Sequence, residues 1–276
     1  MKTFEERLKG GYYPNPPAKM PAYMQEQLEV VESHFDDRKL WTIAQKNVET
    51  NAVVLYLHGG AFVANITQYQ WDMVGVLAGK TKAVFVVPDY PLAPGVNCLE
   101  VYAFIDHLYE QLRSDYPDHR LIVMGDSSGG GMVLGYAQQL RDEGRHQPEQ
   151  IILISPLLDV TMSNPALAEV ADTNKMLTAA ELQLAVEIYA DGMDHRDYRL
   201  SPIYGDFSGL GQISLFIGTH DLMIADSRKL KEILEGQGIA LHYHEYERMF
   251  HVFVAVTRLK ESKEALGLIA ERINQL

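Results

Sequence analysis

The sequence predicts an α/β fold with a mostly parallel central sheet, helices on both faces and a helical cap. Short apolar runs alternate with amphipathic stretches of helical period, which is the spacing of β-α-β units. The runs are apolar at nearly every position, as in strands that helices cover on both faces. One run leads into GDSSG at 125–129, a G-x-S-x-G pattern between a strand and a helix. At 276 residues, we expect a single domain over 1–276 with an insertion.

The expected strands are short runs rich in β-branched residues, with a weak first strand and a last strand that alternates polar and apolar side chains. Residues 1–30 are rich in proline and tyrosine and show no clear period, and a short helical piece is expected around 24–32. We expect strands at 39–46, 52–57, 83–87, 121–124, 150–155, 213–218 and 241–246.

The expected helices are identified by their caps and apolar stripes. Thr67 caps a helix that ends near Gly79, and Asn97 with Glu100 opens an amphipathic helix. Further helices follow the GDSSG turn as far as Gly144, and are expected at 226–236 and around 266–273.

Residues 160–208 interrupt the alternation of strands and helices. Apolar residues in this stretch, such as Leu177, Leu182 and Tyr189, predict helices with no strand among them. Ligands bind at the carboxyl ends of the strands in open α/β sheets, and we expect the insertion to fold over those ends.

Composition limits the classes of partner. The net charge of −13 disfavours nucleic acid and anionic membranes, so a neutral or cationic small molecule is the more natural partner. The N-terminus lacks the apolar core of a signal peptide, and no apolar run is long enough to span a bilayer. Cys98 is the single cysteine, so no internal disulfide is expected and the cytoplasm is the default location. The oligomeric state stays open, with a homo-oligomer as one option.

Ser127 is the candidate nucleophile. A nucleophile elbow holds its serine in a strained turn above the sheet, and the residues two before and two after it must be small. Gly125 and Gly129 fill those positions, and the helix that follows directs its positive end toward the serine. A plain glycine-rich turn or a phosphate cradle is the alternative. A P-loop needs G-K-[ST] and a Rossmann turn needs G-x-G-x-x-G, and GDSSGG spells neither.

A serine nucleophile needs a general base and a group that orients the base. Of ten histidines, His251 lies just after the last expected strand, where an elbow-type hydrolase has its base. The alternative for a lone histidine beside aromatic residues is a packed or surface position. His242 and His244 alternate along a strand and are expected to face outward or sideways.

Asp221 is the candidate orienting acid, because it follows a strand and completes the chain order Ser, Asp, His. Asp159, after the preceding strand, is the competitor. Asp226 is better explained as an acidic residue in the first turn of a helix. His220 with Asp221 lacks a further histidine or cysteine at metal-ligand spacing, so no metal is expected.

Small residues follow the strand at 52–57 in the order His58, Gly59, Gly60, Ala61. Consecutive small residues let backbone N–H groups approach a substrate carbonyl, where each donor is worth about 3 kcal/mol to the transition state. A Gly-Gly pair alone is usually only a turn. Upstream of an elbow, it indicates an oxyanion loop.

Seven motifs in order resemble the signature segments of the bacterial hormone-sensitive-lipase-like esterases (family IV carboxylesterases), which have the α/β-hydrolase fold. They are HGGAF, YPLAP, GDSSGG, ISPLLD, SPIYGDFSGL, GTHDLMIADS and MFHVF, and the match covers roughly residues 50–255. One departure is Ala61, which stands where the family commonly has a third glycine.

The resemblance implies a carboxylic ester hydrolase that needs no cofactor. It implies Ser127 as nucleophile, His251 as base and Asp221 as acid. The implied oxyanion hole consists of the backbone amides of Gly60, Ala61 and Ser128, with flexibility supplied by Gly59. Residues 1–30 and 160–208 resemble the family's cap.

Two other functions compete with ester hydrolysis. Amide or peptide hydrolysis could use the same triad, and some relatives of the fold are ligand receptors that lack the histidine. Within ester hydrolysis, short-chain acyl esters are expected. The insertion is rich in acidic residues, unlike the apolar lid of an interfacial lipase, and Ala61 and Phe62 are expected to add bulk where the acyl group lies.

Overall fold

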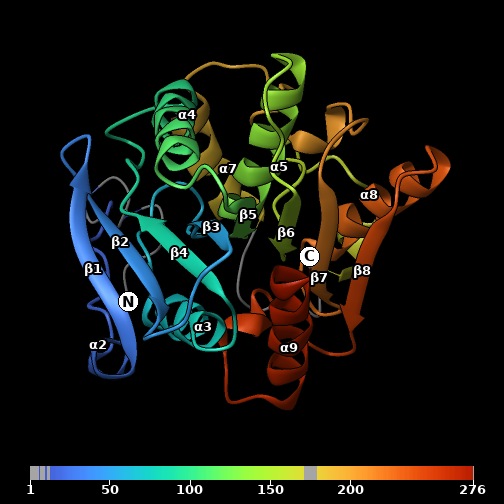
Figure 1. Cartoon of the computed structure of the whole chain (residues 1–276). Coiled ribbons are helices and arrows are strands. Elements are labelled where there is room, and N and C mark those ends of the chain that lie inside the picture. The colour runs from blue at the N-terminus through green and yellow to red at the C-terminus, as the bar shows by residue number, and fades with distance from the viewer. Residues whose placement is uncertain (1–5, 7–9, 11–12, 171–178, 276) are drawn as a thin grey trace.

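The computed structural model describes residues 6, 10, 13–170 and 179–275. These residues form one eight-stranded sheet in the order β1-β2-β4-β3-β5-β6-β7-β8, which runs across the whole molecule (Figure 1). The strands are β1 Leu28–Phe35, β2 Arg38–Gln45, β3 Ala52–Leu57, β4 Ala83–Pro88, β5 Arg120–Asp126, β6 Gln150–Ile154, β7 Gln212–Gly218 and β8 Leu241–Tyr246. β3 to β8 are parallel, whereas β1 and β2 are antiparallel to their neighbours. The expected mostly parallel α/β sheet is confirmed.

The N-terminal edge of the sheet differs from the expectation. Helix α2 (Ala22–Gln27) covers only the first part of the helix expected around 24–32, and the chain continues from Leu28 as strand β1. Asp36 and Asp37 have φ values of 45° and 60°, a left-handed two-residue turn that aspartate tolerates and that joins β1 directly to β2. The helical expectation is confirmed for 24–27 and wrong for 28–32, because β1 is stabilised by its pairing with β2, which local periodicity does not report.

Helices cover both faces of the sheet (Figure 1). α3 (Gln68–Ala78) and α9 (Lys260–Asn274) pack on one face, and α4 (Cys98–Asp115), α5 (Ser128–Asp142) and α8 (Ile224–Gly236) pack on the other. Side chains along β5 alternate between the two cores: Val123 joins the α4–α5 side and Met124 the α3–α9 side. The caps expected at Thr67 and Asn97 are both present, and each forms a capping box with the residue three positions later.

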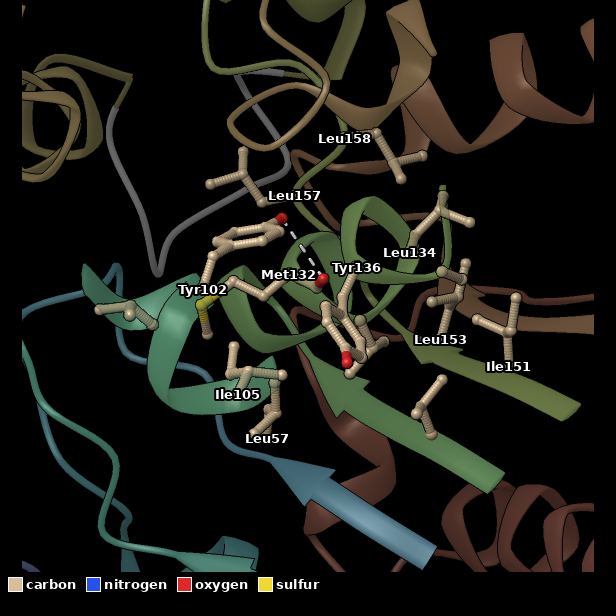
Figure 2. Packing of buried hydrophobic residues seen from close by; sticks show 14 of the residues in the cluster. Leu57, Tyr102, Ile105, Met132, Leu134, Tyr136, Ile151, Leu153, Leu157 and Leu158 are labelled. Atoms are coloured by element: carbon tan, nitrogen blue, oxygen red, sulfur yellow. Dashed lines mark hydrogen bonds between the residues drawn. The ribbon is translucent and has the colours of Figure 1, made fainter. Parts of the chain in front are cut away.

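The core between α4, α5 and the sheet is close-packed around aliphatic side chains (Figure 2). Tyr102 of α4 is buried there, and its hydroxyl donates to the carbonyl oxygen of Met132 in α5 at 3.4 Å. The same hydroxyl lies 2.9 Å from the carbonyl oxygen of Arg199. Tyr102 therefore connects the two helices to the insertion between β6 and β7.

That insertion is helical where the structure describes it. It contains α6 (Leu167–Val170), α7 (Ala179–Ala190) and the 3-10 turn η1 (Pro202–Tyr204), while the expected helical position Leu177 lies outside the described residues. The ring of Tyr189, in α7, stacks on Phe62 in the loop after β3. None of the described helices is long and apolar enough to cross a membrane.

Candidate active site

Ser127 lies at the turn between β5 and α5, at the carboxyl edge of the parallel strands. Its φ of 52° and ψ of −122° are strained for a residue with a side chain. Both of its backbone polar groups are anchored: its N–H donates to Ile154 at 2.9 Å, and its carbonyl accepts from Leu157 at 2.9 Å. The neighbouring strand and the loop after it therefore hold the turn in this conformation.

The two glycines of the motif are required by close contacts. A Cβ on Gly125 would lie 2.4 Å from the backbone of Gly129, and a Cβ on Gly129 would lie 2.0 Å from the carbonyl oxygen of Leu57. No side chain fits at either distance. The expectation that only hydrogen fits two residues before and after Ser127 is confirmed.

Three candidate residues from distant parts of the chain lie in one hydrogen-bonded row. Ser127 Oγ lies 2.9 Å from His251 Nε2, and His251 Nδ1 lies 2.9 and 3.1 Å from the two carboxylate oxygens of Asp221. A carboxylate accepts, so Nδ1 carries a proton and Nε2 of the neutral ring is free to accept from the serine hydroxyl. Asp221 is fully buried, and Ser127 and His251 are 9% and 8% exposed.

The environment of His251 sets its proton affinity. Burial lowers the pKa of His251, but the charge of Asp221 and the hydrogen bond to it outweigh burial, so the pKa of His251 is raised above its ordinary value. The imidazolium form is therefore favoured more than in a free histidine. A base that must hold a proton briefly in a dry site benefits from such a partner.

The loops after β7 and β8 fix the His–Asp pair. The backbone N–H of Met223 donates to Asp221 Oδ1 at 3.0 Å, which orients the carboxylate. Val252, next to His251, has a left-handed φ of 53°, and its N–H donates to Ser155 Oγ at 3.0 Å. The N–H of His220 donates to the carbonyl oxygen of Met249 at 2.9 Å, which ties the two loops together.

The competing acids lie elsewhere. The carboxylate of Asp159 is buried and accepts from the hydroxyls of Thr161 and Tyr204, at 2.6 and 2.8 Å. Asp226 lies in the first turn of α8, as expected, and accepts from Asn164 at 2.8 Å. Of the three aspartates, Asp221 is the one bonded to His251.

His242 and His244 lie on the last strand, away from Ser127. The ring of His244 stacks on Phe216, with centroids 4.7 Å apart, as a histidine packed beside aromatic residues does. Burial lowers the pKa of both histidines. Neither lies in the hydrogen-bonded row that contains His251.

The loop after β3 contains two backbone N–H groups, those of Gly60 and Ala61, that have no acceptor among the described residues. The carbonyl oxygen of Gly60 accepts from the N–H groups of Val63 and Ala64, at 3.1 and 2.9 Å. Within the described part of the chain, the amides of Gly60, Ala61 and Ser128 donate to no acceptor. Gly60 and Ala61 line the same cavity as Ser127, and Ser128 directly follows Ser127 in the chain.

Gly59 has a different use from the expected flexibility. Its N–H is already engaged, because it donates to Asp126 Oδ1 at 3.0 Å. A Cβ at this position would lie 2.6 Å from Asp126 Oδ2 and 2.7 Å from the Cβ of Ser127. Glycine is required here because the loop passes close to the elbow.

A cavity of about 570 Å³ opens above Ser127 and His251. Its walls come from the loop after β3, the first turn of α3 and the segment after His251, including Tyr69, Phe250 and Val256. Phe62 is not among the lining residues. The expectation that Phe62 adds bulk to the acyl site was wrong, because its ring is buried against Tyr189.

A polar network beside the elbow has no counterpart among the sequence predictions. Asp126, inside the G-x-S-x-G motif, accepts from the hydroxyl of Tyr56 and from the side-chain amide of Gln70. The sequence predicts Thr67 as the cap of this helix, but the contact between Gln70 and Asp126 spans 56 residues of sequence. No local pattern reports a contact at that separation.

The family model described as alpha/beta hydrolase fold matches residues 54–255. The chain belongs to this family. An esterase of Acinetobacter venetianus is 28% identical over 222 residues, which cover 79% of this chain and 73% of the relative. An acetyl-hydrolase of Streptomyces hygroscopicus is 28% identical over 204 residues, which cover 72% and 67%.

The solved structures agree with this assignment. A crystal structure of EstE5 soaked with p-nitrophenyl butyrate matches with a TM-score of 0.83 and 25% identity, over 99% of this chain and 91% of that chain. The resemblance to the hormone-sensitive-lipase-like esterases is thereby confirmed. This alpha/beta hydrolase is a serine carboxylesterase.

Proposed function

We propose that the enzyme hydrolyses short-chain carboxylic esters through Ser127, His251 and Asp221, by way of an acyl-enzyme. The observation that carries the proposal is the row in which His251 Nε2 lies 2.9 Å from Ser127 Oγ while Nδ1 is bonded to Asp221. Nucleophile, base and orienting group are the three parts that serine hydrolysis needs.

In the first half of the reaction, Ser127 Oγ attacks the ester carbonyl carbon as His251 Nε2 takes the hydroxyl proton. The carbonyl π bond becomes a lone pair on the oxyanion, which the N–H groups of Gly60, Ala61 and Ser128 stabilise. Such donors are worth about 3 kcal/mol each in the transition state. When the intermediate collapses, the bond to the alkoxy oxygen breaks and His251 returns the proton to the departing alcohol.

In the second half, water replaces the alcohol. His251 takes a proton from the water as its oxygen attacks the acyl carbon, and the same amides hold the second oxyanion. Collapse breaks the bond to Ser127 Oγ, which recovers its proton from His251. Throughout both halves, Asp221 stays ionised, fixes the ring tautomer and stabilises the imidazolium that forms twice per cycle.

The cavity above Ser127 accommodates a small-molecule ester. A volume of about 570 Å³ lies within the ordinary range for small-molecule sites, and apolar side chains such as Phe250 and Val256 supply part of its wall. Each buried methylene gains about 0.8 kcal/mol only while the chain remains inside this cavity. The acetyl-hydrolase relative and the butyrate ester soaked into EstE5 support the same size class.

Amide hydrolysis is the second candidate, because the same row of residues could attack an amide carbonyl. A ligand receptor is disfavoured, since His251 is present and bonded to both partners. A matched panel of p-nitrophenyl esters and p-nitroanilides separates these functions, and we expect turnover of the esters and little turnover of the anilides. Absence of turnover on both would support the receptor.

Ser127→Ala and Ser128→Ala form the pair that tests the roles in this proposal. Ser127→Ala is expected to lose ester hydrolysis, because the attacking hydroxyl is gone. Ser128→Ala is expected to keep much of it, because alanine retains the backbone N–H assigned to the oxyanion hole. Loss of activity in Ser128→Ala with activity retained in Ser127→Ala would show that the nucleophile is misassigned.

A further inference from the structure

Gln70 is a buried polar side chain beside the elbow that the proposed reaction does not use. It projects from the first turn of α3, is 5% exposed and lines the cavity above Ser127. Its Oε1 accepts from the backbone N–H of Thr67 at 2.7 Å, so the other end of the amide group, Nε2, must face the opposite way. On that side Nε2 lies 2.9 Å from Asp126 Oδ2 and 3.4 Å from the carbonyl oxygen of Gly59.

The Gly59–Gly60 peptide is held at its carbonyl end. His58 Nδ1 lies 2.8 Å from the carbonyl oxygen of Gly59, and since a carbonyl only accepts, Nδ1 carries the proton. Gln70 Nε2 is the second donor to that oxygen. In a planar trans peptide the carbonyl and the N–H point in opposite directions, so fixing this oxygen also fixes the N–H of Gly60.

The peptide on the other side of Gly59 is held through Asp126. The N–H of Gly59 donates to Asp126 Oδ1 at 3.0 Å, while Gln70 Nε2 donates to Oδ2 of the same carboxylate. Asp126 immediately precedes Ser127. Gln70 therefore contacts both the carboxylate that accepts from the Gly59 N–H and the Gly59 carbonyl oxygen. It holds the peptides on both sides of Gly59, next to the nucleophile.

We propose that Gln70 is a positioning residue that aims the amide of Gly60 at the developing oxyanion. The inference rests on the proposed function, which assigns the Gly60 amide to the oxyanion hole. An N–H group stabilises the transition state only if it points at the position of the oxyanion. The carbonyl oxygen of the bound ester does not yet occupy that position, so the direction of the N–H group matters. Loss of Gln70 should thus lower kcat and leave KM almost unchanged.

A purely structural role is the alternative, because Gln70 also completes the capping box of α3. The chain offers a matched control in Glu100, the equivalent residue of the capping box at the start of α4. Glu100 is exposed and does not line the cavity. Gln70→Met and Glu100→Met each remove the side-chain acceptor of the N-cap N–H group. Only Gln70→Met also removes the acceptor of the Thr67 hydroxyl and the donor to Gly59 and Asp126.

The experiment measures kcat and KM on p-nitrophenyl acetate, the thermal midpoint, and the inhibition constant of a trifluoromethyl ketone, which forms an oxyanion on Ser127. For Gln70→Met we expect kcat to fall about tenfold, less than the loss of a whole oxyanion donor, with KM within about twofold. The inhibition constant should rise by the same factor as kcat falls. For Glu100→Met we expect only a lower thermal midpoint.

The proposal is overturned if Gln70→Met keeps its kcat and inhibitor affinity and only melts earlier, like Glu100→Met. If Gln70→Met does not fold, Gln70→Ala replaces it, because alanine fits the same space and likewise has no donor for Gly59. A normal kcat in a folded Gln70→Ala variant also overturns the proposal. Ser127→Ala in the same assay separates the two claims, since its full activity would refute the proposed function itself.

Discussion

The rings of Phe62 and Tyr189 lie flat against each other, with centroids 4.0 Å apart and planes 2° from parallel. Phe62 belongs to the loop that carries Gly60 and Ala61, whereas Tyr189 belongs to α7 in the insertion. Ala61 and Phe62 both have left-handed backbones, with φ values of 50° and 65°. The stack therefore holds a strained loop through two rings that do not line the cavity.

We predict that Tyr189→Leu lowers both stability and kcat. Leucine keeps the site apolar but loses the stack, worth about 1 kcal/mol beyond burial, and frees the loop that carries Ala61. Tyr109→Leu is the control, because Tyr109 is also buried and in an aromatic pair, but its partner Tyr136 lies in α5 and not in the loop after β3. Thermal melts with ester kinetics decide the point: an equal loss of kcat in both variants would contradict the link between the stack and the loop.

The pH dependence of ester hydrolysis should follow the protonation of His251. His251 must be neutral to accept the serine proton, and its pKa is raised by Asp221 despite burial. Activity should therefore be lost as pH falls through a value above the ordinary histidine pKa of about 6.5. In Asp221→Asn we expect this limb to move to lower pH and kcat to fall by about four orders of magnitude, because the wrong tautomer is favoured. An unshifted limb in that variant would contradict the assignment.

Asp159→Asn should separate stability from catalysis. Its carboxylate is fully buried and accepts from Thr161 and Tyr204, so the amide leaves at least one donor poorly paired. We predict a loss of about 1 to 3 kcal/mol in the free energy of unfolding, with kcat little changed. Denaturant melts and initial rates test this, and a loss of kcat as large as that of Asp221→Asn would move the orienting acid to Asp159.

The sequence predicted those parts of the molecule that local pattern determines. The elbow at Ser127 follows from the five-residue G-x-S-x-G pattern, although Gly125 is required by the backbone of Gly129 in the same turn and Gly129 by the carbonyl oxygen of Leu57 in β3. The cap at Asn97 follows from three-residue spacing. Strand β1 was missed because its partner lies across the turn at 36–37 and pairing, not period, stabilises it. The orientation of the Phe62 side chain was not predicted, because Phe62 packs on Tyr189, which lies 127 residues later in the chain. No local sequence pattern indicates a contact at that separation.

Substrate length tests the description of the cavity. We predict that rates on p-nitrophenyl esters peak between acetate and butyrate and fall steeply by laurate. Methylene groups beyond the cavity above Ser127 gain no burial, and those forced into it cost strain. Rates should rise smoothly with concentration, without a jump at the solubility limit. A preference for laurate or for emulsified triglyceride would contradict this account of the cavity, although Ser127 could still be the nucleophile.

The central claim is that the hydroxyl of Ser127, activated by His251, attacks the ester carbonyl. Labelling with a p-nitrophenyl dialkyl phosphate tests it most directly, because the activated serine displaces nitrophenolate and keeps the dialkylphosphoryl group. After digestion, fragment-ion mass spectrometry of the peptide that spans 121–141 distinguishes Ser127 from Ser128. We predict one modification, on Ser127, that is greatly slowed in a folded His251→Asn variant. Modification of Ser128, of a serine outside this peptide, or at an unchanged rate without His251 would contradict the claim.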